Sequence, residues 1–523
     1  MSRFRPVFPW SPVILACAIT WSVQGCGIRT ERPVLLPPTQ PPVPTKESPY
    51  LKAHLKSGEL CVFDSWRVAP DGSRIEGTGT RFTVLREPAG TGSQSIPVDS
   101  IALLETNTPE RVSAVAAGVL PVLTVVMSTL TGVCVADPKA CFGSCPTFYL
   151  DEAGQGRPEA EGFSESIARV LEARDVDALF TARPRGRHLA LTMRNEALET
   201  HAVRRVRLLA SERPRGGRVL AGVDGRYHPA SRFARPERCR APEGDCLSAV
   251  AGHDGSERVS LADAGDLATR ENVDLLFPPA RGRVGLVVAA RQTLLTTFLF
   301  YQTMAYLGRG AGDYLAVLER GEKEEAAKAM GMARVLGGID VAVAEGAGPW
   351  ASIGSFDEVG PIAGDVRVLP FESTGREPIR VRLRQAKGHW RLGWVALAHL
   401  GDPVIPRAIE AAAVYRAGRR DPNALARLRG AEGHLVTLPG DAYRITFDLP
   451  RPGAELELFL ETEGYYYEWM RKEWLPEENP PMAALALGWP EEALRRLAGP
   501  FKEREAGLEA AFWSSRFRKG EKR

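Results

Sequence analysis

The N-terminal segment constrains this chain more than any other, because it indicates the compartment in which the chain folds. Arg3 and Arg5 precede a short apolar run over residues 13–23, which leads to Gly25. A basic start, a short apolar core and a small residue before the cleavage point are typical of a secretory signal peptide, whereas a bilayer-spanning helix needs a longer run. We therefore expect residues 1–25 to be a signal peptide and the remainder to fold outside the cytoplasm.

The expected cleavage point carries a second signal. The stretch Val23-Gln24-Gly25-Cys26 resembles the lipobox of bacterial lipoproteins, in which the cysteine becomes the first residue of the mature chain and carries acyl chains such as palmitate. The resemblance implies a protein anchored through Cys26 in the bacterial cell envelope, on its periplasmic or surface face, and Gly27 favours the outer membrane. Two alternatives stay open: a second box ending at Cys17, and a plain signal peptide with an incidental cysteine.

A proline-rich stretch follows the expected lipid attachment site. Residues 26–50 contain six prolines between Pro33 and Pro44. Such spacing favours an extended polyproline II conformation over packed structure. We expect this segment to be a tether between the bilayer and the folded body.

The length and composition of the remainder predict several domains of mixed structure. A chain of 523 residues is too long for one hydrophobic core, and 44% hydrophobic with 25% charged residues is the balance of a globular protein. Short alternating apolar runs between Gly and Pro turns predict strands, so we expect an α+β, multidomain fold. The expected segments are a small SH3-like N-terminal β-barrel over 51–110, an apolar helix or membrane span over 111–137, a cysteine-containing mixed β domain over 138–290, helices over 291–335, a β-sandwich of the galactose-binding-like kind over 336–462 and a helical tail over 463–523.

Local patterns predict several individual elements. They are two strands over 188–210 around Asn195 and Glu196, a strand pair over 379–392 with a turn at Lys387-Gly388, a helix pair over 292–318 interrupted at Gly308 and Gly310, and tail helices that open at Pro490 and at Pro500.

The segment 112–136 contains no charged residue and is long enough to cross a bilayer. Pro121, two glycines and several hydroxyl side chains interrupt its apolar character, and its flanks show no excess of basic residues on one side. We expect a buried or surface-docked helix here, with a true membrane span as the alternative.

The eight cysteines divide into three groups once the N-terminal signals are taken into account. Cys17 is removed with the signal peptide and Cys26 carries lipid, so an even six remain, which in an exported chain predicts three disulfides. Turn spacing favours Cys239 with Cys246 and Cys141 with Cys145, and Cys61 with Cys134 is the remainder. Pairing of Cys134 with Cys145 or with Cys141 stays open.

The segment from Cys141 to Tyr149 carries a further pattern. Its sequence Cys-Phe-Gly-Ser-Cys-Pro-Thr-Phe-Tyr resembles an uncharacterised bacterial domain family marked by Cys-Phe-Gly-x-Cys-Pro-x-Tyr ahead of a β-hairpin. Phe148 stands where that pattern has its tyrosine. The resemblance implies an envelope location and brings no activity with it.

The chemical alternatives at these cysteines are a reactive thiol and a metal site. Three residues separate Cys141 from Cys145, one more than a thioredoxin-like motif has, and Pro146 follows. Equal gaps separate Cys239, Cys246 and His253, but the compact spacing of a zinc knuckle is missing. The sequence also lacks a P-loop and a nucleophile elbow. We therefore expect no catalytic residue, no metal and no cofactor.

Two residue clusters admit both a binding and a structural interpretation. The first is aromatic and could form a glycan platform, although docking of the helical tail is favoured; it comprises Tyr465, Tyr466, Tyr467, Trp469 and Trp474, with Phe512, Trp513 and Phe517 further on. The second is basic and could bind a polyanion, although a solvated sheet face paired with Glu455 and Glu457 is favoured; it comprises Arg380, Arg382, Arg384 and Arg391.

These observations favour a lipid-anchored envelope protein that serves in binding or scaffolding without catalysis. Its partners would be the lipid bilayer, through the acylated N-terminus, and an envelope protein or a glycan. A net charge of +3 gives no sign of a nucleic-acid partner. The alternatives are an envelope enzyme, with hydrolase or thiol chemistry at a site assembled from distant residues, and an integral membrane component that spans at 112–136.

Overall fold

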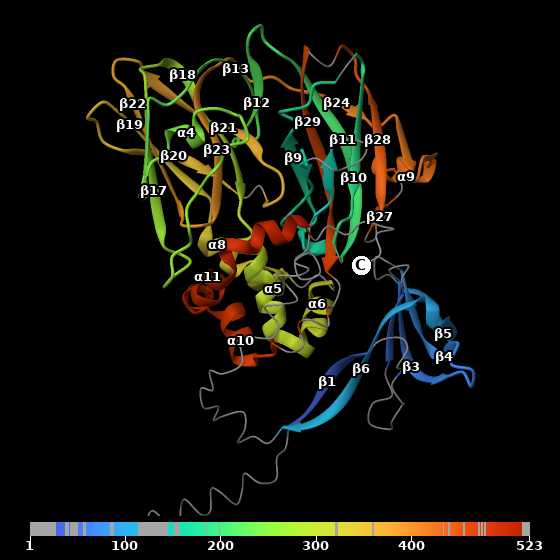
Figure 1. Ribbon diagram of the computed structural model, residues 1–523. Coiled ribbons are helices and arrows are strands. Elements are labelled where there is room, and N and C mark those ends of the chain that lie inside the picture. The colour runs from blue at the N-terminus through green and yellow to red at the C-terminus, as the bar shows by residue number, and fades with distance from the viewer. Residues whose placement is uncertain are drawn as a thin grey trace, which may run out of the picture. The chain divides into compact units, whose positions relative to one another are not determined.

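The computed structural model forms two compact units that divide between Thr129 and Leu130 (Figure 1). It describes residues 28–36, 41, 51–55, 59–83, 88–112, 145–150, 157–184, 186–197, 199–319, 323–357, 360–431, 433–437, 440–452, 455–468, 471, 474 and 477–514. Several features of the sequence analysis lie outside these residues: the segment 1–27 with Cys17 and Cys26, the apolar segment from 113 to 136 with Cys134, Cys141, Trp469 and Phe517.

The first unit is a six-stranded antiparallel sheet with the strand order β1-β6-β2-β3-β4-β5. Alternating apolar residues place Leu51, Phe63 and Ile75 in one core. The first strand lies within the stretch expected to be a tether, where it is extended and pairs with β6 along its whole length. The strands are β1 (Ile28–Leu36), β2 (Leu51–Leu55), β3 (Leu60–Val68), β4 (Arg74–Phe82), β5 (Pro88–Pro97) and β6 (Ile101–Val112).

The second unit contains a β-sandwich whose strands come from both ends of the unit. One sheet has the order β26-β25-β28-β10-β7-β8; the other has the order β24-β11-β29-β9, with β27 paired to β11. Apolar side chains such as Leu191, Val206 and Leu460 fill the sandwich core. The strands are β7 (Thr147–Tyr149), β8 (Ala160–Glu161), β9 (Ala173–Ala178), β10 (His188–Arg194), β11 (Glu199–Glu212), β24 (Arg407–Glu410), β25 (Ala413–Arg416), β26 (Arg419–Arg420), β27 (Leu435–Thr437), β28 (Ala442–Asp448) and β29 (Leu456–Glu468), with α9 (Pro422–Leu428) beside them.

A five-stranded barrel is inserted between the strands of this sandwich. Its strands pair in the order β12-β21-β18-β23-β13, and β13 pairs again with β12, so the ring closes. The short strand β16 (Arg258–Val259) pairs with β23. The barrel strands are β12 (Arg218–Gly222), β13 (Tyr227–Ala234), β18 (Arg281–Gln292), β21 (Asp365–Thr374) and β23 (Trp390–Leu400).

A further sheet, with the order β15-β14-β17-β22-β19-β20, packs against the barrel. Val273 and Val381 of this sheet share a core with Leu286 and Trp390 of the barrel. Figure 1 shows β17, β19, β20 and β22 at the left end of the second unit. The strands are β14 (Arg238–Ala241), β15 (Gly244–Asp245), β17 (Arg270–Phe277), β19 (Ile339–Glu345), β20 (Ala351–Phe356) and β22 (Ile379–Ala386).

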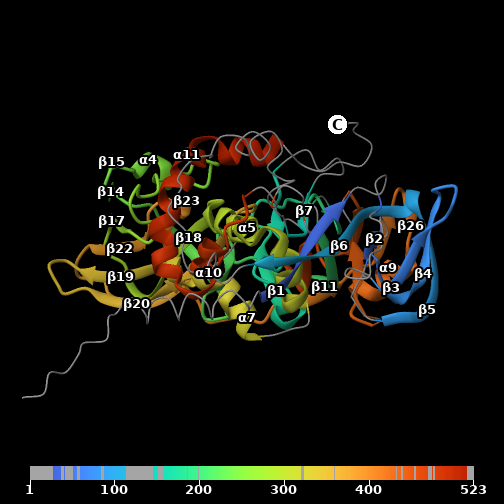
Figure 2. The ribbon, with the colours of Figure 1, turned by 90° about the horizontal axis from the view of Figure 1, so that it is seen from below.

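Helices between β18 and β19 pack together with the helices of the C-terminal tail (Figure 2). The predicted break in the first helix pair is confirmed, because Gly308 adopts a φ of +54° and a 3-10 turn follows it. Pro500 does not open a helix but lies inside α11, where Leu497 and Phe501 continue the buried stripe. The helices are α5 (Leu295–Leu307), α6 (Ala311–Glu319), α7 (Lys323–Ala329), α8 (Gly331–Leu336), α10 (Pro480–Gly488) and α11 (Pro490–Ser514).

The expected α+β, multidomain class is confirmed, with several sheets, a closed barrel and a helical tail. The expected boundaries at residues 290 and 336 are wrong, because strands from 138–290 pair with strands from 336–462 in both the sandwich and the barrel. An alternating pattern identifies a strand but not its partner. A small barrel was expected over residues 51–110. The described strands of the first unit form a sheet whose edge strands are β1 and β5, and the strands that close into a ring lie in the second unit. Among the described residues, no helix is long and apolar enough to cross a membrane.

The expected disulfide between Cys239 and Cys246 is present, with 5.1 Å between the two Cα atoms. It links β14 to the start of α4 (Leu247–Val250). These sulfur atoms are bonded to each other, so they cannot be the thiolate ligands of a metal site with His253. Cys61 is a free thiol in the core of the first unit, where burial raises its pKa to about 11.

We expect the double substitution Cys239→Ala and Cys246→Ala to lower the free energy of unfolding of the second unit by about 2–3 kcal/mol, the chain-entropy value for so short a loop. Urea denaturation monitored by tryptophan fluorescence measures the change. Reducing agent should destabilise the wild-type unit by the same amount and leave the double variant unaffected. Equal stability of the oxidised wild type and the variant would contradict this prediction.

Candidate binding cleft

A cleft of about 490 Å³ lies where the sandwich, the barrel and α11 meet, and we call it the junction cleft. The sandwich, the barrel and α11 all contribute lining residues, which explains why no single stretch of sequence contains the site. They include Glu159, Phe180 and Thr181 from the sandwich side, Arg291, Arg391 and Gly393 from barrel strands, His253 to Glu257 from the loop before β16, and Glu509 and Trp513 from α11.

Two arginines and two glutamates form a charge-compensated group on one wall of the cleft. Arg291 donates to Glu257 at 2.7 and 2.8 Å and to Glu509 at 2.6 Å, and Arg391 contacts the same two carboxylates. Burial acts to lower the pKa of Arg291, but the bonds and charges of Glu257 and Glu509 outweigh burial and raise it. Burial likewise acts to raise the pKa of Glu509, yet Arg291 and Arg391 lower it. The group as a whole carries no net charge.

Aromatic rings form a second wall. The rings of Phe180 and His253 meet edge to face with centroids 4.8 Å apart, and Trp394 of β23 lies 5.7 and 5.9 Å from them. Burial, aided by the charge of Arg218, lowers the pKa of His253. The imidazole is therefore neutral at neutral pH, and its two nitrogens can donate one hydrogen bond and accept another.

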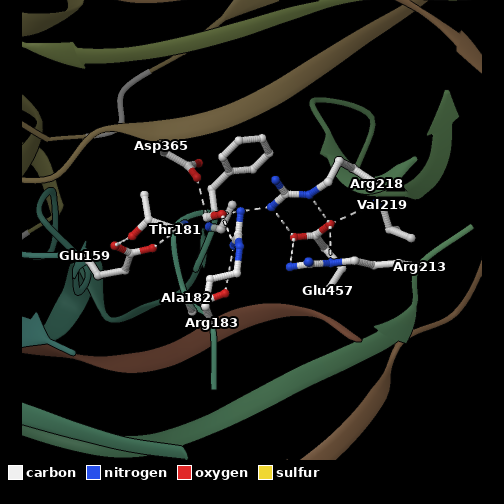
Figure 3. A network of polar contacts seen from close by, with 11 residues as sticks. Glu159, Thr181, Ala182, Arg183, Arg213, Arg218, Val219, Asp365 and Glu457 are labelled. Carbon is white, nitrogen blue, oxygen red and sulfur yellow. Dashed lines mark hydrogen bonds and ion pairs between the residues drawn. The ribbon is translucent and has the colours of Figure 1, made fainter. Parts of the chain in front are cut away.

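A network of polar contacts behind the aromatic wall fixes its position (Figure 3). Glu457 of β29 accepts hydrogen bonds from Arg218 at 2.6 and 2.7 Å, and Arg218 also donates to the carbonyl of Phe180 at 2.8 Å. On the other side of the turn, Glu159 accepts the backbone N–H of Thr181 at 2.8 Å and its hydroxyl. Charged groups on both sides therefore hold the turn that carries Phe180.

The floor of the cleft contains a β-bulge. The register of β23 against β18 shifts by one residue at Gly393, which leaves Gly393 without a partner on β18. A Cβ atom added here would first meet the carbonyl oxygen of Ser256 at 3.4 Å, an ordinary contact distance. The missing side chain keeps the floor open, and a larger residue would project into the cleft without displacing the backbone.

A smaller cavity of about 100 Å³ lies beside α5 and is lined by Cys145, Tyr301, Tyr466 and Glu468 among others. Burial raises the pKa of Glu468 to about 8, although Arg471 acts to lower it. Glu468 accepts a hydrogen bond from Tyr301 and another from Arg471 at 2.8 Å. A space of this size holds only a few water molecules, so the alternative of a reactive thiol at Cys145 finds no substrate-sized pocket here.

The aromatic cluster that the sequence analysis noted is largely buried. Tyr465 to Tyr467 are buried in β29, and Trp474 packs against Tyr301 of α5 with 6.0 Å between ring centroids. The aromatic run was expected to dock the helical tail onto the sandwich, whereas the Trp474 contact is made with α5, a helix between β18 and β19. Phe512 is buried in the same core, and Trp513 lines the junction cleft.

The expectation that four arginines share one sheet face is wrong. Arg380, Arg382 and Arg384 lie on β22 of the outer sheet, whereas Arg391 lies on β23 of the barrel and lines the cleft. The turn at Lys387-Gly388 carries the chain from one sheet to the other instead of closing a hairpin. Their expected partner Glu457 pairs with Arg213 and Arg218.

Most of the charged residues of the cleft could not be identified from the sequence. Glu159, Glu257, Arg291 and Glu509 belong to no motif, and they meet only because the barrel is inserted into the sandwich. Three lining residues belong to patterns noted in the sequence: His253, for a metal site that does not form, Arg391 of the basic cluster and Trp513 of the aromatic cluster. Among the described residues, no group of three or more His, Cys, Asp or Glu side chains has the geometry to hold a metal ion.

Comparisons with known proteins leave the family of this chain open. No family model matches the sequence, and no curated protein matches it. Two solved structures that match are of the arabinofuranosyltransferase AftD from Mycobacteria. The R1389S mutant shares 10% identity over 83% of this chain and 32% of that chain at a TM-score of 0.16; the other shares 12% over 86% and 33% at 0.14. This chain spans about a third of those proteins, and at such TM-scores the likeness carries no argument.

A buried carboxylate positions the segment that separates the two cavities. Glu161 of β8 accepts the backbone N–H groups of Ile362 at 2.5 Å and Ala363 at 2.9 Å, and Ile362 lines both cavities. Gly360 packs directly on this carboxylate with a φ of +83°, where a Cβ would overlap a carboxylate oxygen. Burial raises the pKa of Glu161 to about 8.

We expect the stability of the second unit to fall as pH rises from about 5 to 8, by at most about 1.4 kcal/mol per pH unit from Glu161. The folded state retains the Glu161 proton up to a pKa of about 8, whereas the unfolded chain loses it near its ordinary value. The stabilising contribution is therefore complete at the acidic end of this range and lost as pH passes the folded pKa. Urea denaturation across this pH range measures it.

The variant Glu161→Gln has a side chain that is neutral at every pH. It should therefore lack the contribution of Glu161 to the change in unfolding free energy with pH. Glu503→Gln, at an exposed position of α11, is the control and should retain the wild-type slope. Identical pH profiles for Glu161→Gln and the wild type would show that Glu161 is not the titrating group.

Proposed function

We propose that this protein is a non-catalytic binding protein of the bacterial cell envelope, held at the membrane by acyl chains on Cys26, with the junction cleft as its binding site. The observation that carries the binding role is the compensated group formed by Arg291, Arg391, Glu257 and Glu509. Ionisable groups that neutralise one another suit a rigid recognition wall better than proton transfer, which needs a group free to change its charge.

The envelope location rests on the N-terminal signals and agrees with the chemistry of the cysteines. The Cys239–Cys246 bond is of a kind that persists in oxidising compartments such as the periplasm. The outer membrane remains the favoured site, with a glycan or an envelope protein as partner.

An envelope hydrolase is the second candidate, and Glu159 favours it. Burial raises the pKa of Glu159, while the arginines of the cleft lower that of Glu509. Two carboxyl groups with opposed pKa shifts are the arrangement used for acid–base hydrolysis. Both oxygens of Glu159 accept hydrogen bonds from Thr181, however, which supports a structural role.

Hydrolysis of chromogenic glycosides and esters separates these two functions. The binding proposal expects wild-type rates equal to buffer alone. Turnover that is lost in Glu159→Gln but retained in Glu503→Gln would establish the hydrolase and overturn the non-catalytic role.

We expect the mature protein to begin at Cys26 and to carry acyl chains on that residue. Intact mass spectrometry of the full chain expressed in a bacterial host should show loss of residues 1–25 and the added mass of the lipid. The variant Cys26→Ala should lack the lipid and leave the membrane fraction on carbonate extraction, while Cys17→Ala should behave as the wild type.

The same experiment tests the membrane-spanning alternative. If Cys26→Ala resists carbonate extraction, the segment 112–136 holds the chain in the bilayer and the lipid-anchor proposal fails. A mass without acyl chains on Cys26 would overturn the anchor directly.

A further inference from the structure

We infer that the junction cleft binds a neutral, hydroxyl-rich ligand with the size of one or two sugar rings, such as the exposed end of a glycan. This inference rests on the proposed binding function and names the class of its ligand.

The ion pairs on one wall of the cleft select against a charged ligand; Arg157 and Asp254, which also line the cleft, are exposed to solvent. Each guanidinium of Arg291 and Arg391 already contacts Glu257 and Glu509. An anionic ligand would have to displace one of these carboxylates, and a cationic ligand would have to displace an arginine. Either exchange leaves a buried charge without its partner, which is strongly unfavourable. A neutral ligand leaves all of these ion pairs in place.

Hydroxyl groups can use the hydrogen-bond donors and acceptors that the ion pairs on this wall leave unused. A carboxylate oxygen has two lone pairs and a guanidinium has five N–H groups, so both can bond a hydroxyl while their ion pairs remain. A hydroxyl donates one hydrogen bond and accepts others, and it can therefore bridge a glutamate and an arginine that lie side by side. The neutral imidazole of His253 offers one donor and one acceptor on the adjoining wall.

The aromatic wall and the cleft volume agree with a sugar ring. Phe180, His253 and Trp513 present apolar ring surface to the cleft, and the C–H face of a pyranose is the complementary apolar surface of a hydroxyl-rich ligand. A volume of about 490 Å³ lies within the roughly 300–1,000 Å³ typical of small-molecule sites. The network around Glu457 and Arg218 holds this wall in place before a ligand arrives.

The open floor at Gly393 provides a selective way to block the cleft. Gly393→Leu would fill the space above the bulge. Its Cβ would lie 3.8 Å from the Cγ methylene of Glu257, which is an ordinary van der Waals contact with the stem of that side chain. Gly499→Leu is the matched control, because Gly499 is exposed on α11 with no atom within 4 Å of an added Cβ. Both variants make the same substitution, and only the first occupies the cleft.

The test uses the full chain carrying Cys26→Ala, with galactose, glucose, mannose and N-acetylglucosamine as neutral probes. Glucuronate and glucosamine supply the same ring with a negative or a positive charge. Saturation-transfer NMR detects binding, and tryptophan fluorescence, to which Trp513 in the cleft contributes, measures affinity. We expect at least one neutral sugar to bind and both charged probes to bind at least about tenfold more weakly, a factor that corresponds to about 1.4 kcal/mol.

The expected effect of Gly393→Leu is a loss of at least about tenfold in affinity, since the leucine occupies the ligand's space, while Gly499→Leu binds as the parent chain does. Thermal melting checks that each variant is folded. Binding of none of the four neutral sugars, equal binding of glucuronate, or unchanged affinity in Gly393→Leu would overturn the inference. Lipidation of Cys26 is measured separately, so a failure of this ligand class is distinguishable from a failure of the envelope anchor.

Discussion

Buried carboxylates that bridge the sandwich and the barrel are the interactions on which the rest of the second unit depends. Glu457 of β29 holds Arg218 of β12. Asp365 of β21 accepts the backbone N–H of Ala178 in β9 at 2.9 Å, and Glu161 of β8 binds the segment before β21. A carboxylate removed from water is stable only when its oxygens have partners. These hydrogen bonds are directional, so they fix the orientation of the sandwich relative to the barrel in addition to the apolar packing between them.

The insertion of the barrel into the sandwich explains where the cleft lies. The chain leaves the sandwich after β11, builds the barrel and the outer sheet, and returns to the sandwich at β24. Two bodies joined in this way meet along a seam, and such seams are common sites for small ligands. The bulge at Gly393 in β23 and the turn at Phe180 face this seam. The cleft thus follows from the topology and does not require a dedicated loop.

Local sequence predicted the elements of this fold better than their assembly. Three features could be predicted because each depends on residues close in sequence: the strands around Asn195, the helix break at Gly308 and the Cys239–Cys246 bridge. The sheet partners were not, since an alternating pattern fits a strand in any sheet. The charged group around Arg291 could not be predicted from the sequence either, because Glu509 reaches Arg291 only when α11 is docked.

The C-terminal helix α11 completes the cleft electrostatically. Glu509 supplies one of the two carboxylates that compensate Arg291 and Arg391. Lys502 and Glu505, two turns and one turn earlier, bind the carbonyl and the N–H of Ala262, so the same helix is attached to both backbone groups of this residue. Undocking of α11 would leave the two arginines facing Glu257 alone, so this group would carry a net positive charge. The preference for a neutral ligand is therefore a property of the docked helix, and ligand binding and helix docking stabilise each other through one shared carboxylate.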